Sequence, residues 1–342
     1  MCKPRKNGHP VPDYHTLPIN LRSRPAKLLV DQPAARTQQV IKRNETARWL
    51  CTWGDFNMRL ILVASFLLTS VGQMALTEPA KAASSPGLVG LERQLPNLLS
   101  ARRGEYGIAA LDLRDGSTIT INGNKPFPMA STVKVAIAST YLAQVDHGRR
   151  RMNDMIRGRS AAKLIELMIT RSDNIATDQL LANLGGPSAI QRWLTFNELR
   201  GIRVDRTIAQ LLRERGHLAD RRDVATPVAM VSLLQKLDSG DVLTADSRAV
   251  LFELMSRCRT GSRRIRALLP AGTRVEDKTG TLDGVTNDVG FITMPDGHRV
   301  ALAVFARGGR DRQPGIAKAA RAIYDRFAAS IPVAFASLVP AQ

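Results

Sequence analysis

The chain has 342 residues, of which 44% are hydrophobic, so it has enough apolar side chains for a folded core and is not disordered throughout. Its formal net charge of +19 is typical of a protein that binds nucleic acid. The basic residues are scattered and no recognition motif accompanies them, so we predict a solvated basic surface and no nucleic-acid binding.

The first 57 residues are rich in proline and arginine and show no clear helical or strand period. Residues 58–82 then have the layout of a secretory signal peptide. They comprise a charged start at Met58-Arg59, a short apolar run and the sequence Ala80-Lys81-Ala82 before a cleavage point. We interpret residues 1–57 as a disordered extension, or as a start-site artefact with translation beginning at Met58.

A membrane anchor over residues 60–77 is the alternative to a cleaved signal, but the apolar run is shorter than the roughly 20 residues that a span needs. Cleavage predicts a periplasmic or secreted protein that begins at residue 83 and has no stable membrane partner. Of the three cysteines only Cys258 then remains, which excludes an internal disulfide. The histidines after the signal are widely separated, so neither a metal site nor a cofactor is predicted.

The hydrophobic pattern of residues 83–342 predicts one domain with strands near both ends and helices in the middle. In chain order, the predicted elements are a helix over 88–100, strands over 106–113 and 117–122, helices over 131–144, 161–171, 174–184, 187–194, 226–237 and 245–255, strands over 274–278, 289–294 and 300–305, and a helix over 315–328. This order predicts an α/β (α+β) fold, in which an antiparallel sheet is flanked by helices from both termini and an all-helical insert spans about 131–258. We expect a monomer with its site in the cleft between sheet and insert.

The first of three short motifs is Ser131-Thr-Val-Lys134, at the start of a predicted helix with a Ser/Thr cap. A spacing of three residues places both side chains on the same helix face, where the lysine amine can lie beside the hydroxyl. A lysine with a lowered pKa can take the hydroxyl proton and so activate the serine as a nucleophile. Taken alone, the motif also fits an ordinary helix start.

The second motif, Ser172-Asp173-Asn174, lies between two predicted helices. Ser172 offers a hydroxyl that can relay a proton, and Asn174 offers an amide that can hold a substrate carbonyl. In isolation, the same residues are typical of a helix cap.

The third motif, Lys278-Thr279-Gly280-Thr281, lies at the end of a predicted strand. Two hydroxyls and a cation at this point can bind a substrate carboxylate, and Gly280 allows a close approach to the backbone. The alternative is a strand that simply leads into a turn.

The order S-x-x-K, S-D-N and K-T-G is the signature of class A β-lactamases and penicillin-binding proteins, and the chain resembles this family from about residue 88 to its final helix. Residues 127–130, Thr260-Gly261, Arg264-Ile265-Arg266 and Asn287-Asp288 are also similar to the family. The resemblance implies a serine hydrolase that acts on cyclic amides. Its substrates would be a small-molecule β-lactam or a D-Ala-D-Ala-like peptide, with antibiotic resistance and β-lactam catabolism as the associated roles.

The resemblance also implies roles for individual residues. Ser131 would be the nucleophile, Lys134 its proton acceptor, and Ser172 the group that relays the proton. Asn174 would orient the substrate. The backbone N–H groups of Ser131 and Thr281 would form the oxyanion hole.

Further implied roles concern the substrate carboxylate, which Lys278 and Thr279 would bind. Arg264 is a candidate for a second carboxylate contact, because Thr286 stands where many relatives carry an arginine. A surface ion pair is the alternative for Arg264.

One position departs from the family. Relatives carry a glutamate on an Ω-shaped loop that activates the deacylating water, and here Ile208 stands in its place, with Leu212 where an asparagine is expected. Arg206 and Asp223 are expected to keep the ion pair that closes the loop. General-base help is typically worth about 10²–10⁴-fold, so we predict easy acylation by penicillins and slow deacylation. Glu214 is a possible relocated base, with a surface charge as its alternative.

These residues predict an exported class A β-lactamase-type hydrolase. A D-alanyl-D-alanine peptidase or penicillin-binding acyltransferase uses the same motifs without the glutamate and is the alternative function. A non-catalytic sensor of β-lactams or muropeptides, held by a membrane anchor, is a second alternative.

Overall fold

The structure is a computed structural model that describes residues 86–100, 103–214 and 220–331. The predicted extension 1–57 and signal peptide 58–82 lie outside the described residues. Within the described ranges, no helix combines the length and the apolar character that crossing a bilayer requires.

The elements follow the predicted order, with strands near both ends and helices between them. They are α1 (Pro86–Ser100), β1 (Glu105–Asp112), β2 (Thr118–Ile121), β3 (Phe127–Pro128), the 3-10 turn η1 (Ala130–Val133), α2 (Lys134–Asp146), β4 (Met155–Ile156), β5 (Arg159–Ser160), α3 (Ala161–Thr170), α4 (Asn174–Leu184), α5 (Pro187–Phe196), α6 (Ile208–Glu214), β6 (Val224–Ala225), α7 (Pro227–Ser239), α8 (Ala245–Ser256), η2 (Ile265–Leu268), β7 (Val275–Leu282), β8 (Val285–Thr293), β9 (Arg299–Arg307) and α9 (Arg312–Ala328).

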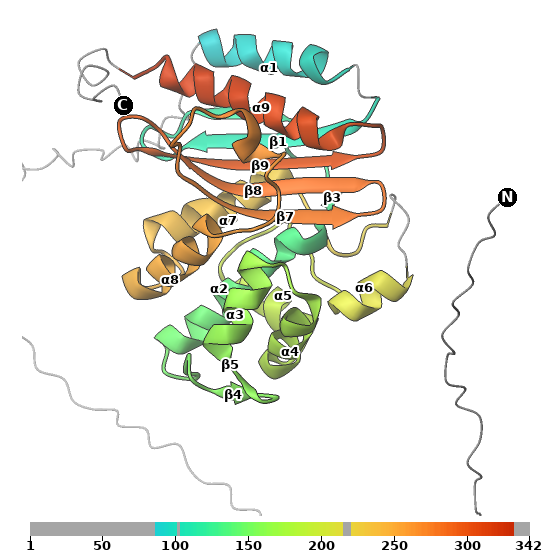
Figure 1. The fold of residues 1–342 in the computed structure, drawn as a ribbon, viewed down its shortest axis with the longest axis vertical. Coiled ribbons are helices and arrows are strands. Elements are labelled where there is room, and N and C mark those ends of the chain that lie inside the picture. The colour runs from blue at the N-terminus through green and yellow to red at the C-terminus, as the bar shows by residue number, and fades with distance from the viewer. Residues whose placement is uncertain (1–85, 101–102, 215–219, 332–342) are drawn as a thin grey trace, which may run out of the picture. The chain divides into compact units, whose positions relative to one another are not determined.

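One five-stranded sheet joins the two ends of the described chain. Its strand order is β2-β1-β9-β8-β7, and every neighbouring pair is antiparallel. Helices α1 and α9 cover one face, and the helices from α2 to α8 lie on the other side (Figure 1). The predicted fold, an antiparallel sheet flanked by helices from both termini with a helical insert, is confirmed, although the insert is not all-helical because it also holds the short strands β4, β5 and β6.

Strand β9 shows why the sheet holds the two layers together. Leu302 and Val304 lie in the core under α1 and α9, whereas Ala303 and Phe305 lie in the core shared with the helical insert. Successive strand side chains point to opposite faces, so an almost wholly apolar strand is buried on both sides. The sheet is therefore a rigid support for residues at its edge.

Two local predictions are wrong. The helix predicted from residue 131 with a Ser/Thr cap instead begins as η1, whose N-cap is Met129 without a side-chain hydrogen bond, and α2 starts only at Lys134. The Lys278–Thr281 motif lies inside β7 rather than at a strand end, because β7 pairs with β8 as far as Leu282. In both cases tertiary contacts override the local signal.

Candidate active site

The three motifs meet beside the edge strand β7, which packs against η1 and whose Lys278 contacts Ser172 in the loop before α4. Although 38 residues separate Ser172 from Lys134 and 106 separate it from Lys278, its hydroxyl contacts both amines. The group formed by Ser131, Lys134, Ser172, Asn174 and Lys278 is called the motif site below.

The turn that carries Ser131 is held against the sheet. Ala130, the residue before it, has φ +50°, a left-handed conformation that is uncommon outside glycine and that the surroundings must maintain. The side-chain amide of Asn287 on β8 donates to the carbonyls of Pro128 and Met129 at 2.8 and 3.0 Å. These bonds fix the entry to η1 relative to β8.

Gly280 on β7 completes this contact. A Cβ atom there would lie 2.6 Å from the carbonyl oxygen of Met129 and 3.1 Å from side-chain atoms of Ala130 and Thr132. Such a contact with backbone cannot relax by turning a side chain. The structure therefore gives Gly280 a role that the sequence did not indicate, which is to let η1 pack against β7.

Lys134 is fully buried, at 0% exposure, and its amine contacts three oxygens. These are the Ser172 carbonyl at 2.7 Å, the Asn174 amide oxygen at 2.8 Å and the Ser172 hydroxyl at 3.1 Å. Burial, aided by the charge of Lys278, lowers the pKa of Lys134 to about 7. A neutral amine has two N–H donors, and the carbonyl and amide oxygens can only accept them, so its lone pair is left for a hydroxyl proton.

Ser172 lies between the two lysines, with its hydroxyl 3.1 Å from the amine of Lys134 and 3.0 Å from that of Lys278. Its φ of +57° is again left-handed, and its carbonyl as well as its hydroxyl contacts Lys134. Burial lowers the pKa of Lys278 to about 8. A hydroxyl between two amines of lowered pKa can pass a proton from one to the other.

The side chains of Thr279 and Thr281 lie on the face of β7 opposite to that of Lys278. The hydroxyl of Thr279 shares a 2.5 Å hydrogen bond with that of Thr260, and the hydroxyl of Thr281 accepts a 2.6 Å bond from Arg264. Arg264 also donates to the carbonyls of Gly280 and Asn287, at 3.1 and 2.7 Å. Because Arg264 is only 5% exposed, its alternative interpretation as a surface ion pair is wrong.

The segment between Arg206 and Asp223 keeps its closing ion pair, with 2.5 Å between the guanidinium and the carboxylate. Glu214, at the end of α6, accepts from Arg206 at 3.0 Å and from Arg222 at 2.9 Å. The bond from Arg206 and the neighbouring positive charges lower the pKa of Glu214. A carboxylate held by two arginines is a weak proton acceptor, which argues against Glu214 as a relocated base.

Ile208 is the first residue of α6 and is buried, whereas Leu212 is 47% exposed. The backbone N–H groups of Ile208 and Ala209 donate to the carboxylate of Asp178 on α4, at 2.7 and 2.8 Å. Asp178 belongs to none of the three motifs that predict the site. The available signal was its spacing of four residues from Asn174, which places both side chains on one face of α4.

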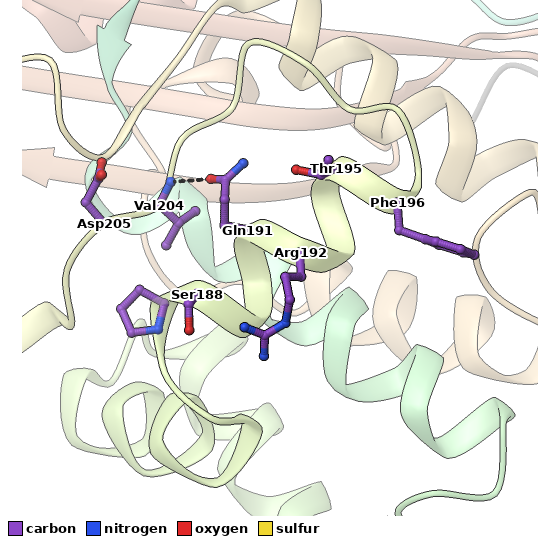
Figure 2. Close-up of a pocket in the computed structure, with 8 residues that line it drawn as sticks. Ser188, Gln191, Arg192, Thr195, Phe196, Val204 and Asp205 are labelled. Carbon is purple, nitrogen blue, oxygen red and sulfur yellow. Dashed lines mark hydrogen bonds between the residues drawn. The ribbon is translucent and has the colours of Figure 1, made fainter. Parts of the chain in front are cut away.

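Other features of the described residues lie apart from this chemistry. A hollow on α5 is lined by Ser188, Gln191 and Arg192, and Figure 2 shows the amide oxygen of Gln191 accepting from Val204, at 3.0 Å. None of the motif residues lines it. Within the described ranges, no group of His, Cys, Asp and Glu side chains could hold a metal ion.

Comparison with known proteins assigns the chain to a family. The model of the β-lactamase enzyme family matches residues 90–327. The extended-spectrum β-lactamase PER-1 of Pseudomonas aeruginosa is 27% identical and covers 78% of this chain and 96% of its own length. β-Lactamase CTX-M-6 of Salmonella typhimurium is 32% identical, with 63% of this chain and 79% of the relative covered.

Solved structures of β-lactamases are also similar to this chain. The class A β-lactamase reconstructed as the last common ancestor of Gram-negative bacteria is 34% identical, with a TM-score of 0.67 over 70% of this chain and 99% of that one. A β-lactamase from Chitinophaga pinensis is 26% identical, with a TM-score of 0.65 over 69% of this chain and 98% of that one. The match extends from α1 to α9 and so includes all three motifs. The chain therefore belongs to the class A β-lactamase family of serine hydrolases.

Proposed function

We propose that this protein is an exported hydrolase of class A β-lactamase type that β-lactams acylate at Ser131. The observation that carries the proposal is the bridge from Lys134 through Ser172 to Lys278 beside the turn that holds Ser131. In this scheme the neutral amine of Lys134 takes the Ser131 proton as the oxygen attacks the substrate carbonyl. Ser172 then passes a proton to the leaving nitrogen.

The rest of the site would hold the substrate in place. Asn174 would orient it, and Lys278 with Thr279 would bind its carboxylate. Because β7 is an edge strand among the described residues, alternate N–H groups along it have no strand partner there, which supports the N–H of Thr281 as an oxyanion donor beside that of Ser131.

Arg264 supports this arrangement from behind the strand. Its guanidinium donates to the Thr281 hydroxyl and to the Gly280 carbonyl, so it would act on the substrate carboxylate by holding this end of β7. A direct carboxylate contact by Arg264, which the resemblance implied, is the alternative role for this residue.

The second acyl-enzyme step is expected to be slow. Ile208 is buried and has no proton-accepting group, and Glu214 is held by two arginines. The same observation favours a D-alanyl-D-alanine peptidase or penicillin-binding acyltransferase as the second candidate, because these enzymes use the three motifs without that glutamate.

Hydrolysis of nitrocefin and labelling by a fluorescent penicillin together separate the two functions. Sustained nitrocefin turnover supports the β-lactamase. A single stoichiometric burst followed by a stable adduct supports the peptidase or acyltransferase. If neither reagent reacts, the proposal is wrong in both forms. Export is tested separately, by the N-terminal sequence of the protein recovered from the periplasm, which should begin at Ala83.

A further inference from the structure

Asp178 follows Asn174 by four residues on α4, so the two side chains lie on the same face of that helix. Asn174 accepts a 2.8 Å hydrogen bond from the amine of Lys134, which directs this face toward the motif site. Asp178 therefore lies one helical turn farther along the face that contacts Lys134.

The carboxylate of Asp178 also joins α4 to α6. One oxygen accepts from the N–H of Ile208 at 2.7 Å, and the other accepts from the N–H of Ala209 at 2.8 Å. Because each oxygen accepts its own bond, the carboxylate is held in one orientation. The result is an oriented negative charge at the junction of α4 with α6, on the α4 face whose Asn174 contacts Lys134.

Asp178 is not the only carboxylate that acts on Lys134, because the charge of Asp173 also favours the Lys134 ammonium. Asp173 accepts from the N–H of Ala176 and caps its own helix. Glu214, Asp220 and Asp223 are paired with arginines. Among the described residues, no ion pair involves Asp178, so its charge is not neutralised by a cation of its own.

We propose that Asp178 is a positioning residue that supplies, from α4, a negative charge to Lys134 that Ile208 cannot supply from α6. The inference rests on the proposed function, because it concerns the proton that passes from Ser131 to Lys134. In that step the O–H bond of Ser131 breaks, its electron pair forms the bond to the substrate carbonyl, and the proton converts the amine of Lys134 to an ammonium. A nearby carboxylate stabilises this ammonium as it forms.

The charges that act on Lys134 from the surrounding elements agree with this role. The charge of Lys278 on β7 lowers the pKa of Lys134, whereas the charges of Asp173 and Asp178 at α4 raise it. Helix α6, which the Asp178 carboxylate joins to α4, begins with the uncharged Ile208. Removing the charge of Asp178 therefore lowers the pKa of Lys134 and makes its amine a weaker base.

The Asp178→Asn variant tests the proposal, because it keeps the side-chain shape and one of the two bonds to α6 while it removes the charge. Two effects are expected in the rate of acylation by a penicillin. The acid limb of the pH profile moves to lower pH by a few tenths of a unit or more, since Lys134 is neutral at lower pH. The rate on the alkaline plateau falls several-fold, since the amine is a weaker proton acceptor.

Thr207→Ala is the matched control. The hydroxyl of Thr207 accepts from the N–H of Gln210 at 3.2 Å and so caps α6 independently of Asp178. Its loss loosens the start of α6 and leaves the charge in place, so the acid limb should not move. If it moves as far as in Asp178→Asn, the effect belongs to the docking of α6 and the inference is overturned.

A readout without β-lactam separates this inference from the proposed function. Titration of the Lys134 amine, followed by NMR in the full chain with isotopically labelled lysine, should give a lower pKa in Asp178→Asn than in the wild type. An unchanged pKa overturns the inference even if acylation occurs. Absence of acylation in the wild type refutes the proposed function and leaves the titration to decide the role of Asp178.

Discussion

Replacing Gly280 by alanine tests the contact between η1 and β7. The new Cβ atom would lie 2.6 Å from the Met129 carbonyl oxygen, whereas an ordinary carbon–oxygen contact is about 3.3 Å or more. The turn and the strand must therefore separate by about 0.7 Å. Overpacking of this size typically costs about 1–3 kcal/mol, which lowers the melting temperature by about 2–10 °C and leaves the protein folded.

The effect on chemistry should be larger than the effect on stability. Separation moves Ser131 away from the groups held on β7, and a misplacement of about 1 Å can cost about 10²-fold in rate. Stopped-flow acylation by a fluorescent penicillin should therefore be slowed by about 10- to 100-fold.

Gly90→Ala is the matched control for this substitution. Gly90 lies in α1, and apart from its chain neighbours and its own helix backbone no atom of the described residues lies within 4 Å of the added Cβ. The change should therefore leave acylation unaffected and stabilise the helix by up to about 1 kcal/mol. If Gly280→Ala is acylated at the wild-type rate and melts at the wild-type temperature, the contact between η1 and β7 does not have the role given to it.

Three further predictions concern protonation and positioning. The acylation rate should rise with pH through about 7, because Lys134 accepts the Ser131 proton only after losing its own, and a flat profile from pH 5 to 9 would contradict this. Glu214→Gln should leave the acyl-enzyme lifetime unchanged, because the carboxylate is held by Arg206 and Arg222, and faster or slower release of the bound penicillin would show that Glu214 takes part in deacylation. Asn287→Ala removes the donor to the carbonyls of Pro128 and Met129, so it should lower the free energy of unfolding in urea by about 1–3 kcal/mol and slow acylation. If neither the unfolding free energy nor the acylation rate changes, the role assigned to the Asn287 amide is disproved.

Helix positions were predictable where the signals are local. Helix α4 spans Asn174–Leu184 as predicted, since Asp173 accepts from the N–H of Ala176 at one end and Gly185 takes a left-handed conformation, with φ +97°, at the other. Both signals act within one turn of the helix and are visible in the sequence.

Helix α6 was not predictable in the same way. It has seven residues, too few to be stable alone, and its first N–H groups are satisfied by Asp178, 30 residues earlier in the chain. The contact of Gly280 with Met129 and the bonds of Arg264 behind β7 also depend on tertiary packing. Motif order indicated which residues lie together, but their individual contacts required the fold.

The most direct test is whether the hydroxyl of Ser131 reacts with a penicillin. Intact-mass measurement of the protein after incubation with a penicillin, followed by peptide mapping over several hours, would locate the acyl group and give its lifetime. We expect one penicillin per chain on the peptide that contains Ser131, persistence of the adduct because deacylation is slow, and no adduct in Ser131→Ala. An adduct on another residue, or labelling that survives in Ser131→Ala, would contradict this expectation.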